Sequence, residues 1–259
     1  MIAILSPAKS LDYDRPLPDV TLTKPRFSEE AHQLARSAAK LGARKLGKLM
    51  HISDKLAKLN AQRYRDFEEA PERPALFAFN GDVYLGFEAR TLDEPAVSFA
   101  QDHVRILSGL YGLLRPLDMM KPYRLEMGTR WAPGRSKTLY DHWNTRIGDA
   151  LAHELAAEGS GVIINLASKE YWRAVENCPP TGARIITVDF RDTGPDGPYF
   201  NSFGAKRARG MMARWLCEHR IEEPEHLKGF DSDGYRFKAE GSETDRWCFI
   251  RDQAQAEHA

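Results

Sequence analysis

The stretch GVIINLASKEYW (residues 161–172) carries the pattern on which the fold prediction depends. An apolar run rich in Ile leads into Ser168, and charged and aromatic residues follow. Short runs of this composition are typical of β-strands, and serine is one of the residues preferred at the N-cap of a helix. Two further apolar runs end at a serine in the same way, namely IAIL (2–5) before Ser6 and VRIL (104–107) before Ser108.

Two interpretations of these serine-ended runs are open. In the first, the serines cap three helices, and Pro7 after Ser6 fits the proline that often occupies the first helical position. In the second, the strands are parallel and their ends meet at one edge of a sheet. Helix N-termini at such an edge carry free N–H groups and partial positive charge, which suits a phosphate ligand.

Similar runs recur along the chain. They are rich in Ile, Val, Phe and Tyr, and Gly or Pro lies near several of them, so we expect them to be strands as well. These runs are ALFAF (75–79), ARIITVDF (183–190), YFNSF (199–203), YRF (235–237) and RWCFI (246–250).

Longer segments with helical spacing separate the strand-like runs. Ser28 is expected to cap a helix over about 29–40. Apolar residues four positions apart predict a second helix over 144–157. A similar apolar stripe is formed by Ala208, Met211, Met212 and Trp215.

This mixture of elements predicts a mixed α/β or α+β fold. We expect a single domain over residues 1–259, with one sheet flanked by helices and a helical insertion at about 28–70. A hydrophobic content of 42% is ordinary for a globular protein and supplies enough apolar residues for a sizeable core.

The composition also narrows the location and the chemistry. The three cysteines are far apart and form no disulfide framework or zinc-binding pattern, which favours a reducing compartment. The N-terminus does not resemble a signal peptide, and no apolar run approaches the roughly 18 residues that span a bilayer. We therefore expect a cytoplasmic protein without membrane contact, metal or cofactor.

Charge is unevenly distributed, although 37 basic residues balance 37 acidic ones. The thirty residues from Arg36 to Arg65 hold nine basic residues and one acid, which gives them a net charge of +8. Two further basic patches lie at 115–137 and 205–209. Any single patch is equally consistent with a solvated helix face, but three together favour a polyanionic partner.

The basic region contains LMHISDKLA (49–57), which suggests two helices joined by a tight turn. Leu49, Ile52 and Ala57 match the apolar and small positions of a helix–hairpin–helix, in which backbone N–H groups hold a DNA phosphate. A plain helical hairpin is the alternative. His51 and Ser53 stand where glycine is usual, so we expect a distorted turn or a less closely held phosphate.

Longer motifs point to a known family. They are SPAKSLDY at the N-terminus, HISDKLAKLNAQRY, FNGDVYLGF (79–87), LSGLYGLLRPLDMMKPYRLEMG (107–128), INLASKEYW (164–172) and NSFGAKRARGMMARW (201–215). The chain resembles the YaaA family of bacterial peroxide-stress resistance proteins from residue 1 to about 250. The resemblance implies a cytoplasmic protein that limits damage by hydrogen peroxide and unincorporated iron. It also implies an α/β fold with a helix–hairpin–helix and a basic cleft that binds DNA, including bent DNA.

These observations predict a partner and a site. The partner is double-stranded DNA, including bent or damaged DNA, bound through its phosphates with little sequence preference. One cleft is expected to be lined by Lys9, Arg115, Lys121, Arg124, Lys206, Arg207 and Arg209. The hairpin is expected at its rim, contributing Lys45, Lys48, His51, Ser53, Lys55 and Lys58. The sequence leaves the oligomeric state open and is compatible with a monomer.

Two alternative functions remain. A base-excision enzyme could use Lys9 as a Schiff-base amine or Asp82 as a carboxylate. Against this, Lys9 could instead form a salt bridge or phosphate contact, and Asn-Gly-Asp at 80–82 suggests a tight turn. An iron-binding protein is the lesser alternative, because its candidate ligands, His103 with Asp102 and His142 with Asp141, are paired only by adjacency.

Overall fold

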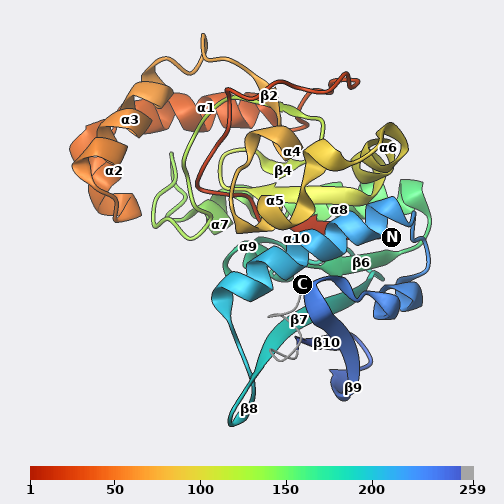
Figure 1. Ribbon diagram of the computed structural model, residues 1–259. Helices are drawn as coiled ribbons and strands as arrows, with labels where there is room; N and C mark the ends of the chain where they lie inside the picture. Colours follow the sequence, from red (N-terminus) through yellow and green to blue (C-terminus); the bar gives the residue numbers. More distant parts are fainter. Residues whose placement is uncertain (252–259) are drawn as a thin grey trace.

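The fold is built around an eight-stranded, mostly parallel sheet, and the computed structural model describes residues 1–251 (Figure 1). The strand order is β4-β3-β1-β6-β7-β10-β9, and β8 pairs with β7. The strands are β1 (Ile2–Leu5), β3 (Val104–Ser108), β4 (Gly112–Leu114), β6 (Val162–Asn165), β7 (Arg184–Gly194), β8 (Gly197–Tyr199), β9 (Tyr235–Glu243) and β10 (Arg246–Arg251). A separate two-stranded sheet pairs β2 (Arg73–Pro74) with β5 (Met119–Met120).

The centre of the sheet is parallel. Strand β1 pairs in parallel with β3 on one side and with β6 on the other, and β6 continues in parallel to β7 and β10. All four residues of β1 are fully buried. Strands β1 and β6 are covered on both faces, which explains why their runs are almost continuously apolar, whereas burial alternates along β7.

Helices cover both faces of the sheet, and three of them form a projecting arm (Figure 1). In this view α5 and α10 lie in front of the sheet and α8 and α9 behind it, while α1, α2 and α3 extend away at the upper left. The helices are α1 (Ser28–Ala39), α2 (Gly42–Met50), α3 (Asp54–Arg65), α4 (Ala75–Ala78), α5 (Asp82–Phe87), α6 (Glu94–His103), α7 (Leu139–Trp143), α8 (Arg146–Glu158), α9 (Lys169–Glu176) and α10 (Ser202–Glu218). The arm confirms the helical insertion expected at about 28–70.

Two glycines bring α5 and α10 into backbone contact. A Cβ atom at Gly210 would lie 1.7 Å from the carbonyl oxygen of Val83, and one at Gly86 would lie 2.1 Å from that of Arg207. Any larger residue at either position would force the helices apart. This contact fixes the N-terminus of α5 beside the basic first half of α10.

Most predicted strands are confirmed, but two are wrong. ALFAF (75–79) contains the short helix α4, and the amides of Ala75 and Leu76 bond to the carbonyl oxygens of Asp118 and Pro116. A short buried apolar run has the same composition in a strand and in a helix, so the sequence did not distinguish them. YFNSF (199–203) is divided between the end of β8 and the start of α10, because Asn201 caps that helix.

The predicted helix over about 29–40 is present, but Ser28 is its first residue rather than its cap. The N-cap is Phe27, which makes no side-chain capping hydrogen bond.

The serine-ended runs follow the second interpretation. No helix directly follows Ser6 or Ser108 in the described chain, and Ser108 ends a strand that turns back into β4. Ser168 does precede α9, yet its side chain does not cap that helix. Instead, Ser6 Oγ accepts a hydrogen bond from the Ser168 amide at 2.9 Å. The parallel strands bring the three serines to one edge of the sheet.

Candidate functional site

A cleft of about 860 Å³ opens at the carboxyl edge of the parallel strands. Its walls come from the loop after β1 (residues 6–10), the N-termini of α5 and α9, the middle of β7, and α10. Ligands of open α/β sheets bind at this edge, because the loops and helix N-termini that follow the strands meet there. The position of the cleft therefore makes it the main candidate site.

The cleft carries excess positive charge. Its walls hold six basic and three acidic residues. The basic ones are Lys9, Lys169, Arg191, Lys206, Arg209 and Arg246, and the acidic ones are Asp82, Glu170 and Asp189. A net charge of about +3 in a chain that is neutral overall favours an anionic ligand.

Two of these cations form only loose ion pairs. Lys206 Nζ lies 3.9 Å from Asp82 Oδ2, and Lys9 Nζ lies 3.5 Å from Glu126 Oε1. The Lys206 and Lys9 side chains are 51% and 66% exposed. Exposed pairs of this kind contribute little to stability, so either ammonium group is available to a phosphate.

Arg209 is the most deeply placed cation of the cleft. Burial lowers the pKa of its guanidinium, and the nearby Asp189 carboxylate opposes that shift. Within residues 1–251 its Nε atom is buried without a hydrogen-bond partner. A buried donor without an acceptor is costly, so an anion that entered the cleft and accepted this bond would be favoured.

The N-terminus of α9 forms a polar part of the wall. Ser6 Oγ holds the Ser168 amide, and the two serine hydroxyl oxygens lie 3.3 Å apart. Lys169 begins the helix and lines the cleft. The first-turn N–H groups and the helix dipole add to the positive potential at this point.

The second basic feature is the α2–α3 arm. Its two helices are joined by residues 51–53, and His51 adopts the left-handed conformation with φ 50° and ψ 50°. The Ile52 amide bonds to the Gly47 carbonyl oxygen at 3.1 Å, and a Cβ at Gly47 would lie 3.3 Å from that of Ala57. The turn thus closes tightly, with histidine in the left-handed conformation that glycine usually supplies.

The start of α3 is capped and exposed. Ser53 Oγ accepts a hydrogen bond from the Leu56 amide at 3.4 Å, as predicted for an N-cap. Helix geometry leaves the Asp54 and Lys55 amides without an intrahelical acceptor. All six residues predicted for the hairpin site are exposed, namely Lys45, Lys48, His51, Ser53, Lys55 and Lys58.

The prediction that seven cations line one cleft is only partly correct. Lys9, Lys206 and Arg209 line it, and Arg207 lines an adjoining hollow that shares Asp82 with it. Arg124 lies beside the cleft rather than in it, because its guanidinium pairs with the same Glu126 carboxylate oxygen that faces Lys9.

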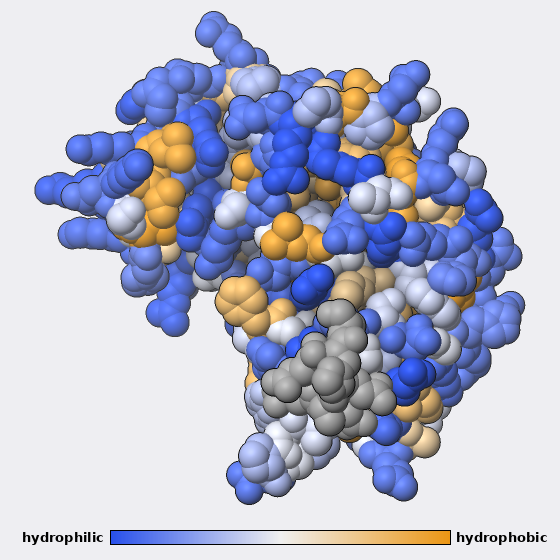
Figure 2. Space-filling view, viewed as in Figure 1, coloured by the Kyte–Doolittle hydropathy of each residue, from blue (hydrophilic) through white to orange (hydrophobic). Residues whose placement is uncertain are grey.

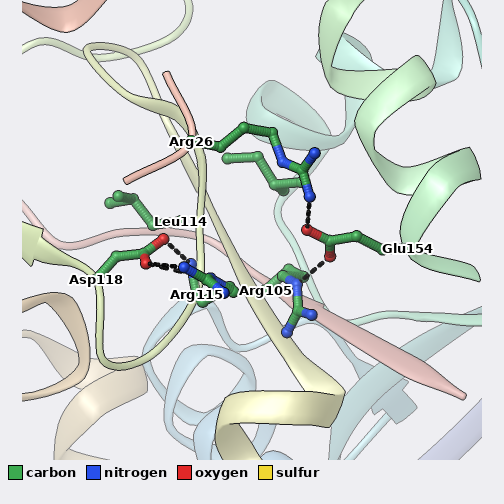
Figure 3. Close-up of a pocket in the computed structure, with 7 residues that line it drawn as sticks. Arg26, Arg105, Leu114, Arg115, Asp118 and Glu154 are labelled. Carbon is green, nitrogen blue, oxygen red and sulfur yellow. Dashed lines mark hydrogen bonds and ion pairs between the residues drawn. The ribbon is translucent and has the colours of Figure 1, made fainter. Parts of the chain in front are cut away.

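Arg115 and Lys121 lie elsewhere. Arg115 pairs with Asp118 in a separate small pocket, where Arg26 and Arg105 both hold Glu154 (Figure 3). Lys121 is buried, and its ammonium group donates to the Glu68 carbonyl oxygen.

The physical reason is that the cations of the basic run 115–137 meet different partners. Arg115 pairs with Asp118, Lys121 donates to the Glu68 carbonyl oxygen, and Arg124 pairs with Glu126. Neighbouring cations in that run therefore point to different surroundings.

Three cleft cations were not predicted. Lys169, Arg191 and Arg246 come from α9, β7 and β10, where each stands next to an acidic residue in the sequence and belongs to no basic run. The one available signal was the position of Lys169 directly after Ser168, which the strand pattern had already marked. Asp82 begins α5 after its N-cap Gly81, and it lines the cleft.

Residues 1–251 contain no group of three or more His, Cys, Asp or Glu side chains that could hold a metal ion. His103 Nδ1 is engaged 3.0 Å from the Met1 carbonyl oxygen. In the same part of the chain, no helix is both long and apolar enough to cross a membrane.

The fold and site define an α/β protein with a basic cleft at the carboxyl edge of its sheet and a basic helical arm. The family described as peroxide stress protein YaaA matches residues 1–241, and the chain belongs to that family, as its motifs indicated. A "UPF0246 protein" of Rhizorhabdus wittichii is 69% identical over 251 residues, covering 97% of this chain and 99% of the relative. A "UPF0246 protein" of Paracidovorax citrulli is 50% identical over 259 residues, covering 98% and 100%.

Proposed function

We propose that this protein binds duplex DNA through its phosphates, with little sequence preference, and that this binding serves the peroxide-stress role of its family. The observation that carries the proposal is the exposed turn between α2 and α3, where cations surround free amides at a helix N-terminus. Figure 2 shows hydrophilic side chains projecting from this arm.

The turn has the chemistry of a phosphate site. Backbone N–H groups at a helix N-terminus bind anions, and the helix dipole adds to the attraction. Lys55 places an ammonium group in the same turn. Such a site contacts the DNA backbone and reads no base, because phosphate contacts carry no sequence information directly. Asp54 stabilises the free helix there but opposes the phosphate, so the surrounding cations must outweigh it.

The cleft supplies the second contact surface. A short series of contacts joins it to the arm: Tyr64 of α3 donates to the Arg124 carbonyl oxygen at 2.7 Å, and Arg124 and Lys9 both pair with Glu126. These contacts tie the C-terminal end of α3 to the segment beside the cleft. Two basic surfaces joined in this way suit a long polyanion better than a small molecule.

The structure does not favour base excision over simple binding. A lysine that forms a Schiff base is typically desolvated, whereas the Lys9 side chain is 66% exposed and lies 3.5 Å from the Glu126 carboxylate. Asp82 is itself paired with Lys206. We therefore propose binding without covalent chemistry.

The test is the salt dependence of binding to two duplexes of equal length and unrelated sequence. Each neutralised phosphate releases condensed counterion, so log Kd should rise with log salt concentration with a slope of several units. The two duplexes should bind with similar Kd at every salt concentration. Absence of binding, or tight binding that salt does not weaken, would refute the proposal.

A further inference from the structure

A hollow of about 280 Å³ lies between the loop after β1 and the helices α4 and α5, and we call it the aromatic pocket. The short 3-10 helix η1 (Ala89–Thr91) also contributes to its wall. Its apolar lining consists of Leu76, Phe77, Phe79, Tyr84, Leu85 and Ala89. Pockets for drug-sized molecules are mostly apolar and measure about 300–1,000 Å³. The aromatic pocket therefore suits a small molecule with a single ring.

The aromatic pocket is separated from the basic cleft by one wall. The Asn80 amide donates to the Ser10 carbonyl oxygen at 2.9 Å, and the Asp12 amide donates to that of Ala78 at 2.8 Å. Ser10 lines the cleft, whereas Asp12 and Asn80 line the aromatic pocket. Among the described residues, none lines both hollows. The aromatic pocket is therefore a separate site.

The charges of the aromatic pocket balance, unlike those of the cleft. Its walls hold two basic and two acidic residues, namely Arg15, Arg90, Asp12 and Glu88. The Asp12 carboxylate accepts from two backbone amides and pairs with both arginines at 3.2 Å. Arg90 is held as well, because it donates to the Pro16 carbonyl oxygen. A site with balanced charge favours a neutral or zwitterionic ligand over an anion.

Two opposite charges of the pocket remain accessible to a ligand. Arg15 pairs with Asp12 through its Nε atom, and its side chain is 59% exposed. Glu88 Oε2 lies 3.8 Å from Arg214, and the Glu88 side chain is 56% exposed. A guanidinium group binds a carboxylate through paired N–H groups, and a carboxylate accepts hydrogen bonds from an ammonium group. The two ends of a zwitterion would match both residues.

The aromatic rings supply the apolar part of the recognition. The Phe79 and Tyr84 ring centroids lie 5.2 Å apart, with the planes tilted by 35°. Tyr84 is fixed in place, because its hydroxyl donates to the Ser6 carbonyl oxygen at 3.1 Å. A further ring packs favourably against such a pair at centroid separations of about 4.5–7 Å. Leu85, an exposed apolar side chain in the wall, would be covered by the same ligand.

We propose that the aromatic pocket binds a free aromatic α-amino acid. Its ring packs on Phe79 and Tyr84. Its carboxylate pairs with Arg15, and its ammonium group pairs with Glu88. An acid or an amine with the same ring would satisfy one charge alone, and an aliphatic amino acid would leave the rings uncovered. This site is independent of the proposed DNA binding.

The experiment titrates the isotope-labelled protein with four compounds and follows its amide NMR signals. L-phenylalanine carries all three features, phenylacetate lacks the ammonium group, phenethylamine lacks the carboxylate, and L-alanine lacks the ring. L-phenylalanine should bind most tightly and shift the signals of Asn80 and Thr91, which line the pocket. L-alanine should bind roughly tenfold or more weakly, as expected for losing the burial of a large apolar group. Phenylacetate and phenethylamine should bind about two- to fivefold more weakly, because each loses one exposed ion pair.

Two variants assign the charges. Glu88→Gln should weaken L-phenylalanine about two- to fivefold without weakening phenylacetate, which has no ammonium group to lose. Arg15→Gln should weaken L-phenylalanine to a similar extent without weakening phenethylamine, which has no carboxylate. Lys238→Gln is the matched control, because Lys238 is exposed in β9 and does not line the pocket. Thermal unfolding checks that the variants are folded, which we expect because these side chains are exposed.

Each outcome decides the inference without reference to DNA. It is supported if L-phenylalanine shifts the pocket signals and each variant loses affinity as described. It is overturned if L-phenylalanine shifts no pocket signal, or if L-alanine or phenylacetate binds as tightly. It is also overturned if both variants bind L-phenylalanine like the wild type, or if the shifts map to cleft residues such as Lys206. A protein that binds no DNA would refute the proposed function and leave this test unchanged.

Discussion

Lys55→Glu distinguishes a phosphate-binding turn from an ordinary helical hairpin, because it should change stability and binding in opposite directions. Lys55 is exposed in the first turn of α3, directly after Asp54. A cation there opposes the helix dipole, so replacing it with glutamate should stabilise the free protein by about 0.3–1 kcal/mol. A residue that only shaped the hairpin would leave DNA binding unaffected.

The expected loss of affinity follows from counterion release. Removing one phosphate contact lowers the salt slope by about 0.9, which corresponds to about 1.2 kcal/mol, or about eightfold in Kd, at about 0.1 M salt. Repulsion between the new carboxylate and the phosphate increases this loss. The effect should be the same for duplexes of any sequence, because the contact is to the backbone.

The assay is fluorescence anisotropy with a labelled duplex over a series of salt concentrations, together with urea unfolding of each protein. Lys238→Glu is the matched control, because Lys238 is an exposed cation in β9, far from the arm (Figure 1). The control should keep the wild-type Kd and slope. If Lys55→Glu binds as tightly as the wild type at every salt concentration, the hairpin is not a phosphate site.

Three further predictions concern stability, each measured by urea unfolding. His51→Gly relieves the strain of a left-handed backbone at φ 50° and should raise the free energy of unfolding by about 1 kcal/mol without weakening DNA binding. A lower free energy of unfolding in this variant would contradict the prediction. Gly210→Ala places a methyl group 1.7 Å from the Val83 carbonyl oxygen and should lower the free energy of unfolding by about 3 kcal/mol or more. Burial alone would raise the pKa of Asp192, but hydrogen bonds led by that from Arg251 hold it below 3.8. Its ion pair therefore stabilises the protein above about pH 4, and this stabilisation is lost as the pH falls through the lowered pKa. Asp192→Asn should therefore lower the free energy of unfolding by roughly 3 kcal/mol at neutral pH and by progressively less in acid.

The sequence determined the elements that depend on local chemistry. Nearly continuous apolar runs defined β1, β3 and β6, because a strand buried on both faces is mostly apolar. Arg105 in β3 is an exception, and its charge is paired with Glu154. Ser53 marked the start of α3, because its hydroxyl satisfies a helix amide only a few residues away. The long motifs identified the family, which the comparison confirmed. Whether the hairpin holds a phosphate stays a prediction, because the same local pattern also forms a plain hairpin.

The tertiary structure alone decided which charges share a site. Lys206 and Arg209 face Lys9 across nearly 200 residues of chain because glycine contacts bring α10 against α5 at the edge of the sheet. Arg115 also lies in a basic stretch of the sequence, yet its guanidinium pairs with Asp118 in another pocket. The direction and partners of a charged side chain depend on which distant elements pack beside it, and the spacing of residues along the chain does not contain that information.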